Sequence, residues 1–174
     1  MILRKSLILV ACFSAALAAR AARAEEPVGC AAFKWSIAED QTALSAEKRA
    51  MVENGGALAY GAATTARLAP LDAIRFPSPP ERAPKLGTFA AIVTLPAPPV
   101  AGVYRLTLSD AAWVDAIQDG AALKPLAFSG ARDCPHVRKT LKFQLSDKPL
   151  TLQISGAPAP EIALIVHADE AAPR

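Results

Sequence analysis

Residues 140–154, T-L-K-F-Q-L-S-D-K-P-L-T-L-Q-I, decide the fold of this chain. Apolar side chains occupy every second position on both sides of a turn at 146–149, namely Leu141, Phe143, Leu145, Leu150, Leu152 and Ile154. Successive side chains of a strand point to opposite faces of its sheet. The stretch therefore predicts a β-hairpin with one buried face and one solvated face.

Shorter segments of the same kind surround this hairpin and are separated by glycine, proline and the turn dipeptide Asp119-Gly120. We expect strands at 57–60, 64–68, 88–95, 102–108, 113–118, 123–128 and 162–166, and a weaker one at 71–76. Residues 162–166 are apolar on both faces, which indicates a central strand. The prolines of 76–84 cannot donate ladder hydrogen bonds, so that stretch predicts an extended surface connection. About nine short strands predict a mainly β fold, an antiparallel β-sandwich of jelly-roll or immunoglobulin-like kind.

Residues 37–53 differ from the rest because they are rich in Ala, Glu, Lys, Leu and Met and end before Gly55-Gly56. Ser36, three residues before Glu39, has the spacing of a capping box. The segment predicts one helix, or two short helices of which the second begins at Ser45.

The first 24 residues have the layout of a secretory signal peptide. A basic start precedes an apolar run at 6–19, and Ala22-Arg23-Ala24 supplies a small-x-small cleavage site. The run is shorter than the roughly 20 residues of a membrane-spanning helix. We expect cleavage after Ala24 and a periplasmic or secreted protein without a membrane span. The alternative is a lipoprotein in which Cys12 is lipidated.

Cleavage would reverse the sign of the net charge. The full chain has 19 basic and 16 acidic residues and a formal net charge of +3. Four basic residues and no acidic residue precede position 25, which leaves 15 basic against 16 acidic residues and a net charge of −1. The basic balance of the full chain therefore gives no indication of a nucleic-acid partner. We expect an N-terminal segment at 25–56, a sandwich domain at 57–168 and a flexible tail at 169–174.

Cys30 and Cys134 are the two cysteines that follow the expected cleavage site. In an oxidising compartment an even pair usually forms a disulfide. Closing a loop of about 100 residues stabilises a fold by about 4–5 kcal/mol in the chain-entropy account. Free thiols or a metal-binding pair are the alternatives.

Several short motifs resemble those of a group of short exported proteobacterial proteins whose function is not established. The motifs are Gly102-Val103-Tyr104, Trp113-Val114-Asp115, Asp133-Cys134-Pro135, Arg138-Lys139, Phe143-Gln144-Leu145 and Leu152-Gln153-Ile154-Ser155-Gly156. Some members of that group carry the name homogentisate 1,2-dioxygenase. The chain is also similar to small β-sandwich modules that accompany secreted peptidases, where a G-x-Y strand and a following aromatic strand recur.

The dioxygenase name implies a non-haem iron site, which commonly uses two histidines and one carboxylate. The chain has two histidines, His136 and His167, and no short motif brings them together. His136 adjoins the expected disulfide turn, and His167 follows the last expected strand. We therefore expect no metal, no cofactor and no catalytic residue, and keep a small metalloenzyme as the alternative.

Trp113 and Asp115 are two residues apart, so an expected strand at 113–118 places them on one face. An indole that stacks on a sugar ring and a carboxylate that accepts hydroxyl hydrogen bonds suit carbohydrate recognition. The alternative buries Trp113 in the core, with Asp115 near an edge or hydrogen bonded.

Five basic or titratable residues lie close together before and within the hairpin: Arg132, His136, Arg138, Lys139 and Lys142. Such a cluster can bind a carboxylate, a phosphate or an anionic glycan. The alternatives are solvated charge with pairing to Asp133, or a partner surface in an envelope assembly.

The sequence thus predicts an exported, non-catalytic binding or envelope accessory module for a glycan or an anionic ligand. The candidate ligand-binding residues are Trp113, Asp115, His136 and Arg138. A metalloenzyme and a purely structural interaction protein are the alternatives.

Overall fold

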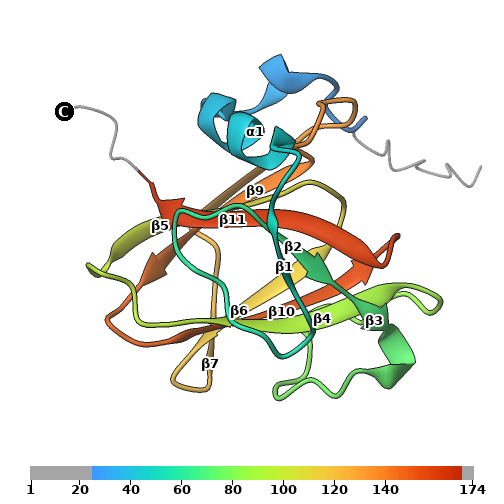
Figure 1. Cartoon of the computed structure of the whole chain (residues 1–174), viewed down its shortest axis with the longest axis vertical. Helices are drawn as coiled ribbons and strands as arrows, with labels where there is room; N and C mark the ends of the chain where they lie inside the picture. The colour runs from blue at the N-terminus through green and yellow to red at the C-terminus, as the bar shows by residue number, and fades with distance from the viewer. Residues whose placement is uncertain (1–24, 170–174) are drawn as a thin grey trace, which may run out of the picture.

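Two β-sheets stacked face to face form the body of the computed structural model, which describes residues 25–169 (Figure 1). The six-stranded sheet has the spatial order β1 (Ala50–Val52), β2 (Thr64–Arg67), β11 (Glu161–Ala168), β5 (Gly102–Leu108), β9 (Lys139–Leu145) and β8 (Ala127–Gly130). The five-stranded sheet has the order β3 (Ala69–Pro70), β4 (Phe89–Leu95), β10 (Leu150–Ala157), β6 (Trp113–Gln118) and β7 (Ala121–Leu123). All these strand pairs are antiparallel except β1 with β2. The predicted mainly β sandwich is confirmed, and its jelly-roll or immunoglobulin-like assignment stays a prediction.

Alternating residues of the strands fill the space between the two sheets. On β9, Leu141, Phe143 and Leu145 are 5% exposed or less, as the hairpin pattern predicts. The core cluster also includes inward residues of β4, β5, β6, β10 and β11. β11 lies between β2 and β5 and buries apolar residues on both faces, which confirms its predicted central position.

The expected solvated faces of the sheets are partly covered. On β9 Thr140 is fully buried, and on β10 Gln153 is fully buried, although Gln144 remains exposed. The N-terminal segment covers the first of these faces, and the proline-rich loop at 76–86 contacts the second, where Gln153 bonds both backbone groups of Ser78. The alternation thus identified the inner faces correctly but not what lies outside them.

The N-terminal segment contains η1 (Cys30–Ala32) and α1 (Ala38–Ser45), and α1 lies over the outer face of the six-stranded sheet (Figure 1). Ile37 and Leu44 pack there against Ala163 and Ile165 of β11 in a second apolar cluster. This cluster explains why every second residue of β11 can be apolar on the side away from the main core.

The predicted helix at 37–53 is too long. α1 ends at Ser45, no second helix begins there, and residues 50–52 form β1 instead. Arg49 donates hydrogen bonds to the carbonyls of Leu44 and Ala46, which satisfies the end of the helix. Parallel pairing with β2 then overrides the helix propensity of β1, an outcome that depends on residues more than ten positions away.

The predicted capping box is also absent. Ile37 is the N-cap residue and makes no side-chain cap bond, and the Ser36 hydroxyl only accepts a long 3.5 Å bond from the N–H of Ala38.

Three of the expected strands, including the weaker one at 71–76, differ from the structure. Residues 57–60 make a single bridge, between Ala57 and Thr94, and 71–76 contain the 3-10 turn η2 (Leu71–Ala73). Residues 123–128 do not form one strand, because Pro125 separates β7 from β8 and the chain crosses there from one sheet to the other.

The expected signal peptide, the alternative lipidation site Cys12 and residues 170–174 lie outside the described residues. Asp169, placed in the flexible tail by the sequence, is anchored, since its N–H donates to the carbonyl of Val103 at 2.9 Å. None of the helices within 25–169 has the length and hydrophobicity needed to cross a membrane.

Candidate functional site

A cleft opens where the start of β6 approaches β8 and β9, and the proline-rich loop and the N-terminal segment also line it. Its volume is about 630 Å³, which lies within the usual range of small-molecule sites. Its charged lining residues are Glu26, Lys34, Arg82, Lys85, Arg138 and Lys139. Five of these six are basic, and we call the site the cationic cleft.

Trp113 lines this cleft from the first position of β6. Its indole Nε1 donates a 2.8 Å hydrogen bond to Oδ1 of Asp115, which is only 7% exposed. The shared face of the two residues is confirmed, but Trp113 is half-buried and stands outside the core cluster. Asp115 therefore orients the indole instead of presenting its carboxylate to solvent.

Two cations lie near the Trp113 ring. Nζ of Lys139 is 5.3 Å and Cζ of Arg82 is 5.8 Å from the ring centroid, distances typical of cation–π contacts. Burial, together with the charges of Arg138 and Arg82, lowers the pKa of Lys139. The protonated amine is therefore held at an energetic cost that a bound anion would reduce.

Phe128 and Ser155 also line the cleft, and they carry an aromatic ring and a hydroxyl. Phe128 is 60% exposed, and Nζ of Lys34 lies 5.2 Å from its ring centroid. Ser155, the cross-strand neighbour of Trp113, is 1% exposed, and its Oγ meets no hydrogen-bond partner within residues 25–169. The cleft thus combines cations with an exposed aromatic face, and the Ser155 hydroxyl is buried behind its lining.

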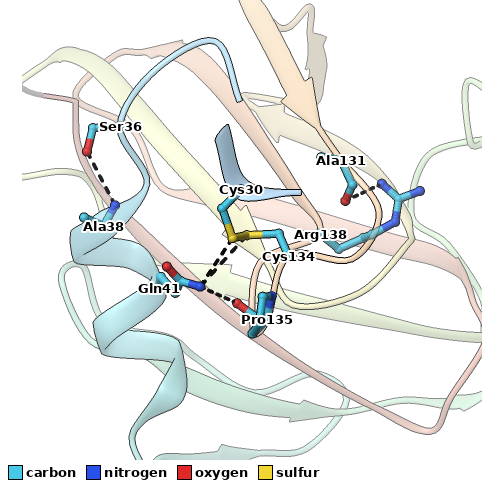
Figure 2. The surroundings of a disulfide bond; sticks show 8 residues. All are labelled: Cys30, Ser36, Ala38, Gln41, Ala131, Cys134, Pro135 and Arg138. Atoms are coloured by element: carbon cyan, nitrogen blue, oxygen red, sulfur yellow. Dashed lines mark hydrogen bonds between the residues drawn. A yellow bond between two sulfur atoms is a disulfide. The ribbon is translucent and has the colours of Figure 1, made fainter. Parts of the chain in front are cut away.

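Arg138 lies at the junction of the cleft and the N-terminal segment. Its guanidinium pairs with the carboxylate of Glu26 and donates a 3.4 Å hydrogen bond to the carbonyl of Ala131, and Figure 2 shows the second contact. Arg138 immediately precedes β9, so the start of that strand fixes its position.

A disulfide joins Cys30 to Cys134, as the cysteine count predicts (Figure 2). Gln41 reaches from α1 towards the sulfurs, and its Nε2 donates a 2.9 Å bond to the carbonyl of Pro135. The disulfide therefore joins η1 to the loop before β9, and the Gln41 hydrogen bond connects α1 to the same loop.

The basic residues of 132–142 do not form one site. Arg138 and Lys139 line the cationic cleft. Lys142 lies on the outer face of the six-stranded sheet, where its Nζ is 4.5 Å from the ring centroid of Trp35. Arg132 is half exposed and lies 3.9 Å from Glu26.

His136 is not brought to the cationic cleft with Trp113 and Arg138. It is exposed, with a backbone φ of 63°, and lines a separate hollow that also contains Ser109 and Glu161. Ser109 there accepts a hydrogen bond from the N–H of Ala163.

A second polar cluster lies under α1, and we call it the buried ion network. Asp40, 1% exposed, accepts hydrogen bonds from Thr107 at 2.8 Å and pairs with Arg105 at 3.2 Å. His167 Nε2 lies 2.6 Å from the same carboxylate. Burial alone would raise the pKa of Asp40, but the hydrogen bonds from His167 and Thr107 and the charge of Arg105 outweigh it and leave the pKa lowered.

Asp169 extends this network towards Lys142. It lies 3.7 Å from Arg105 and 2.5 Å from Lys142. Opposite charges therefore face each other throughout the network, in contrast to the cationic cleft.

The two histidines thus have different neighbours: His167 belongs to the buried ion network and His136 to the separate hollow. Across residues 25–169, no group of three His, Cys, Asp or Glu side chains is arranged to hold a metal ion.

Sequence reasoning missed Lys34, Arg82 and Lys85 as cleft residues. Arg82 lies in the stretch 76–84 that the sequence predicts only as an extended connection, and Lys85 follows it directly. Two basic side chains within a proline-rich stretch were the available signal, although nothing in the local sequence shows which face the loop covers.

Comparison of the chain with protein-family models, with curated proteins and with solved structures found no match.

Proposed function

We propose that this chain is an exported, non-catalytic binding module whose cationic cleft takes an anionic saccharide. The observation that carries this proposal is the excess of five basic side chains over one acidic side chain around a single cavity. From residue 25 onwards acidic residues outnumber basic ones by one, so this excess is local.

The lowered pKa of Lys139 supports an anionic ligand. The charges of Arg138 and Arg82 both act on Lys139, and of these three cations only Arg138 pairs with a carboxylate of the lining. Charge-assisted hydrogen bonds from such groups to a carboxylate are about twice as strong as neutral ones.

The aromatic side chains and the cavity size support a saccharide in place of a simple ion. Phe128 offers an exposed ring face, and Trp113 borders the same cavity. A volume of about 630 Å³ accommodates one or two sugar rings. The disulfide and the layout of the first 24 residues support an exported protein.

Calorimetric titration with trigalacturonate, an acidic sugar, and with maltotriose, a neutral one, tests the proposal. We expect trigalacturonate to bind, with an affinity that falls as salt is added, and maltotriose not to bind. Equal binding of both sugars, or binding of neither, would contradict it. Tighter binding of tetraglutamate than of trigalacturonate would replace the saccharide with an acidic segment of a partner protein.

Arg138→Ala and Arg132→Ala form a matched pair, because both arginines pair with Glu26 and only Arg138 lines the cleft. We expect Arg138→Ala to weaken trigalacturonate binding by about ten- to a hundredfold, the value of a charged hydrogen bond. Arg132→Ala should bind within about threefold of the wild type. Equal losses in both variants would place the ligand elsewhere.

Phe128→Ala separates a sugar from a simple anion. The exposed ring contributes little to the core, so the melting temperature should be unchanged. We expect weaker trigalacturonate binding and unchanged binding of inorganic sulfate. An unchanged affinity for trigalacturonate would leave an anion site without saccharide recognition.

A further inference from the structure

The position of Glu26 is set by the chain that follows it. The N–H of Arg132 donates to the carbonyl of Pro27 at 2.8 Å, and the N–H of Gly29 donates to the carbonyl of Arg132 at 2.7 Å. The disulfide at Cys30 follows immediately. Backbone bonds and a covalent bond therefore deliver the Glu26 side chain to the mouth of the cationic cleft.

The Glu26 carboxylate pairs with the Arg138 guanidinium, a group that an anionic ligand in the cleft would also bind. One of its oxygens pairs with Arg138, and the other lies 3.9 Å from Arg132. Among the charged residues that line the cleft it is the single acid. Its side chain is 47% exposed, and it precedes the first backbone anchor, so it can swing away while Pro27 and Gly29 stay in place.

We infer that Glu26 is an internal competitor that occupies the position of the ligand's carboxylate on Arg138. This inference rests on the proposed function and adds the chemistry of the contact: a ligand carboxylate replaces the Glu26 carboxylate on the same guanidinium. Every ligand then binds against this internal carboxylate, so a small monoanion gains little and a ligand with further contacts to Lys139 and Phe128 is favoured.

The competitor is tested with Glu26→Gln and its neighbour Glu25→Gln, which removes the same charge from a residue outside the cleft lining. We expect Glu26→Gln to bind trigalacturonate about two- to fivefold more tightly than the wild type. This factor corresponds to the free energy of an exposed ion pair. Glu25→Gln should match the wild type. Both variants should unfold at the wild-type urea concentration.

The gain must also depend on Arg138. In an Arg138→Ala background, Glu26→Gln should no longer increase the affinity, because the contested cation is gone. A gain that persists there, or an equal gain in Glu25→Gln, would overturn the competitor and leave the cleft as the binding site. If neither wild type nor Glu26→Gln binds any of the anions, the proposed function falls and the competitor with it.

Discussion

The buried ion network and the cationic cleft use the same kinds of side chain in opposite ways. In the network, Asp40 faces Arg105 and His167, and Asp169 faces Arg105 and Lys142. In the cleft, the cations of Lys139 and Arg82 both lie within 6 Å of the centroid of one indole ring. In the first cluster the charges are paired within the chain, whereas in the second a single acid, Glu26, faces five basic side chains.

The pKa shifts of the two regions express this difference. The pKa of Asp40 is lowered although burial opposes it, because its neighbours stabilise the charged form. The pKa of Lys139 is lowered because burial and like charges destabilise the charged form. A downward shift thus accompanies a stabilised charge in one place and a destabilised charge in the other.

The largest expected effect comes from removing the acid at the centre of the network. Asp40→Ala leaves Arg105 buried without its nearest partner, and we expect a loss of about 3–5 kcal/mol in the free energy of unfolding, measured in urea. The matched control is Glu39→Ala, which changes an exposed acid of the same helix turn and should cost less than about 1 kcal/mol.

Acid provides a second measurement of Asp40. Because its folded pKa is lowered, its contribution is fully present above the unfolded pKa of about 3.9 and is lost as pH falls through the folded value. The wild type should therefore lose more stability than Asp40→Ala below about pH 4. Parallel acid titrations of the two proteins would show that the network is not stabilising.

The disulfide is expected to have the next largest effect. Cys30→Ala combined with Cys134→Ala should cost about 2–5 kcal/mol. Because the bond lies beside α1, amide exchange should accelerate in α1 and remain slow in β6 and β10. Reductant should lower the wild type to the level of the double variant and leave the variant unaffected. Unchanged stability after both thiols become titratable would contradict this.

The strands of the two sheets were predictable because apolar and polar residues alternate within 88–118 and 140–154, and this alternation indicates which side chains are buried. Leu141 and Phe143 had to face a core wherever their sheet lay. The end of α1 was not predictable in this way, because β1 exists only through its pairing with Thr64–Arg67.

Neither the buried ion network nor the cationic cleft could be predicted from residues that are neighbours in the sequence. Arg105 alternates with apolar residues along its strand, and nothing near it in the sequence indicates that Asp40, 65 positions earlier, covers it. Arg82 reaches the cleft in a loop that Gln153 and Ser78 hold in place. Trp113 and Arg138 were found because aromatic and basic side chains are conspicuous in a sequence. Glu26, the partner of Arg138, is an ordinary acid near the start of the described residues.

The smallest expected effect on stability comes from Lys139 in the cationic cleft. Lys139→Met removes a disfavoured charge and one hydrogen bond to the carbonyl of Ala112, so at pH 7 we expect stability equal to the wild type or up to about 1 kcal/mol higher. The control Lys124→Met, at an exposed position, should match the wild type.

The size of the Lys139 effect should depend on pH. Below its lowered folded pKa the amine is charged in both states, and the folded state alone carries the penalty. As pH rises through the folded pKa towards the unfolded value of about 10.4, the folded protein loses the proton first and the penalty disappears. Urea unfolding at pH 7 and pH 9.5 should therefore show the wild type gaining on Lys139→Met. If Lys139→Met is instead strongly destabilised at pH 7, as Asp40→Ala is, Lys139 belongs to a satisfied cluster and the distinction between the two regions fails.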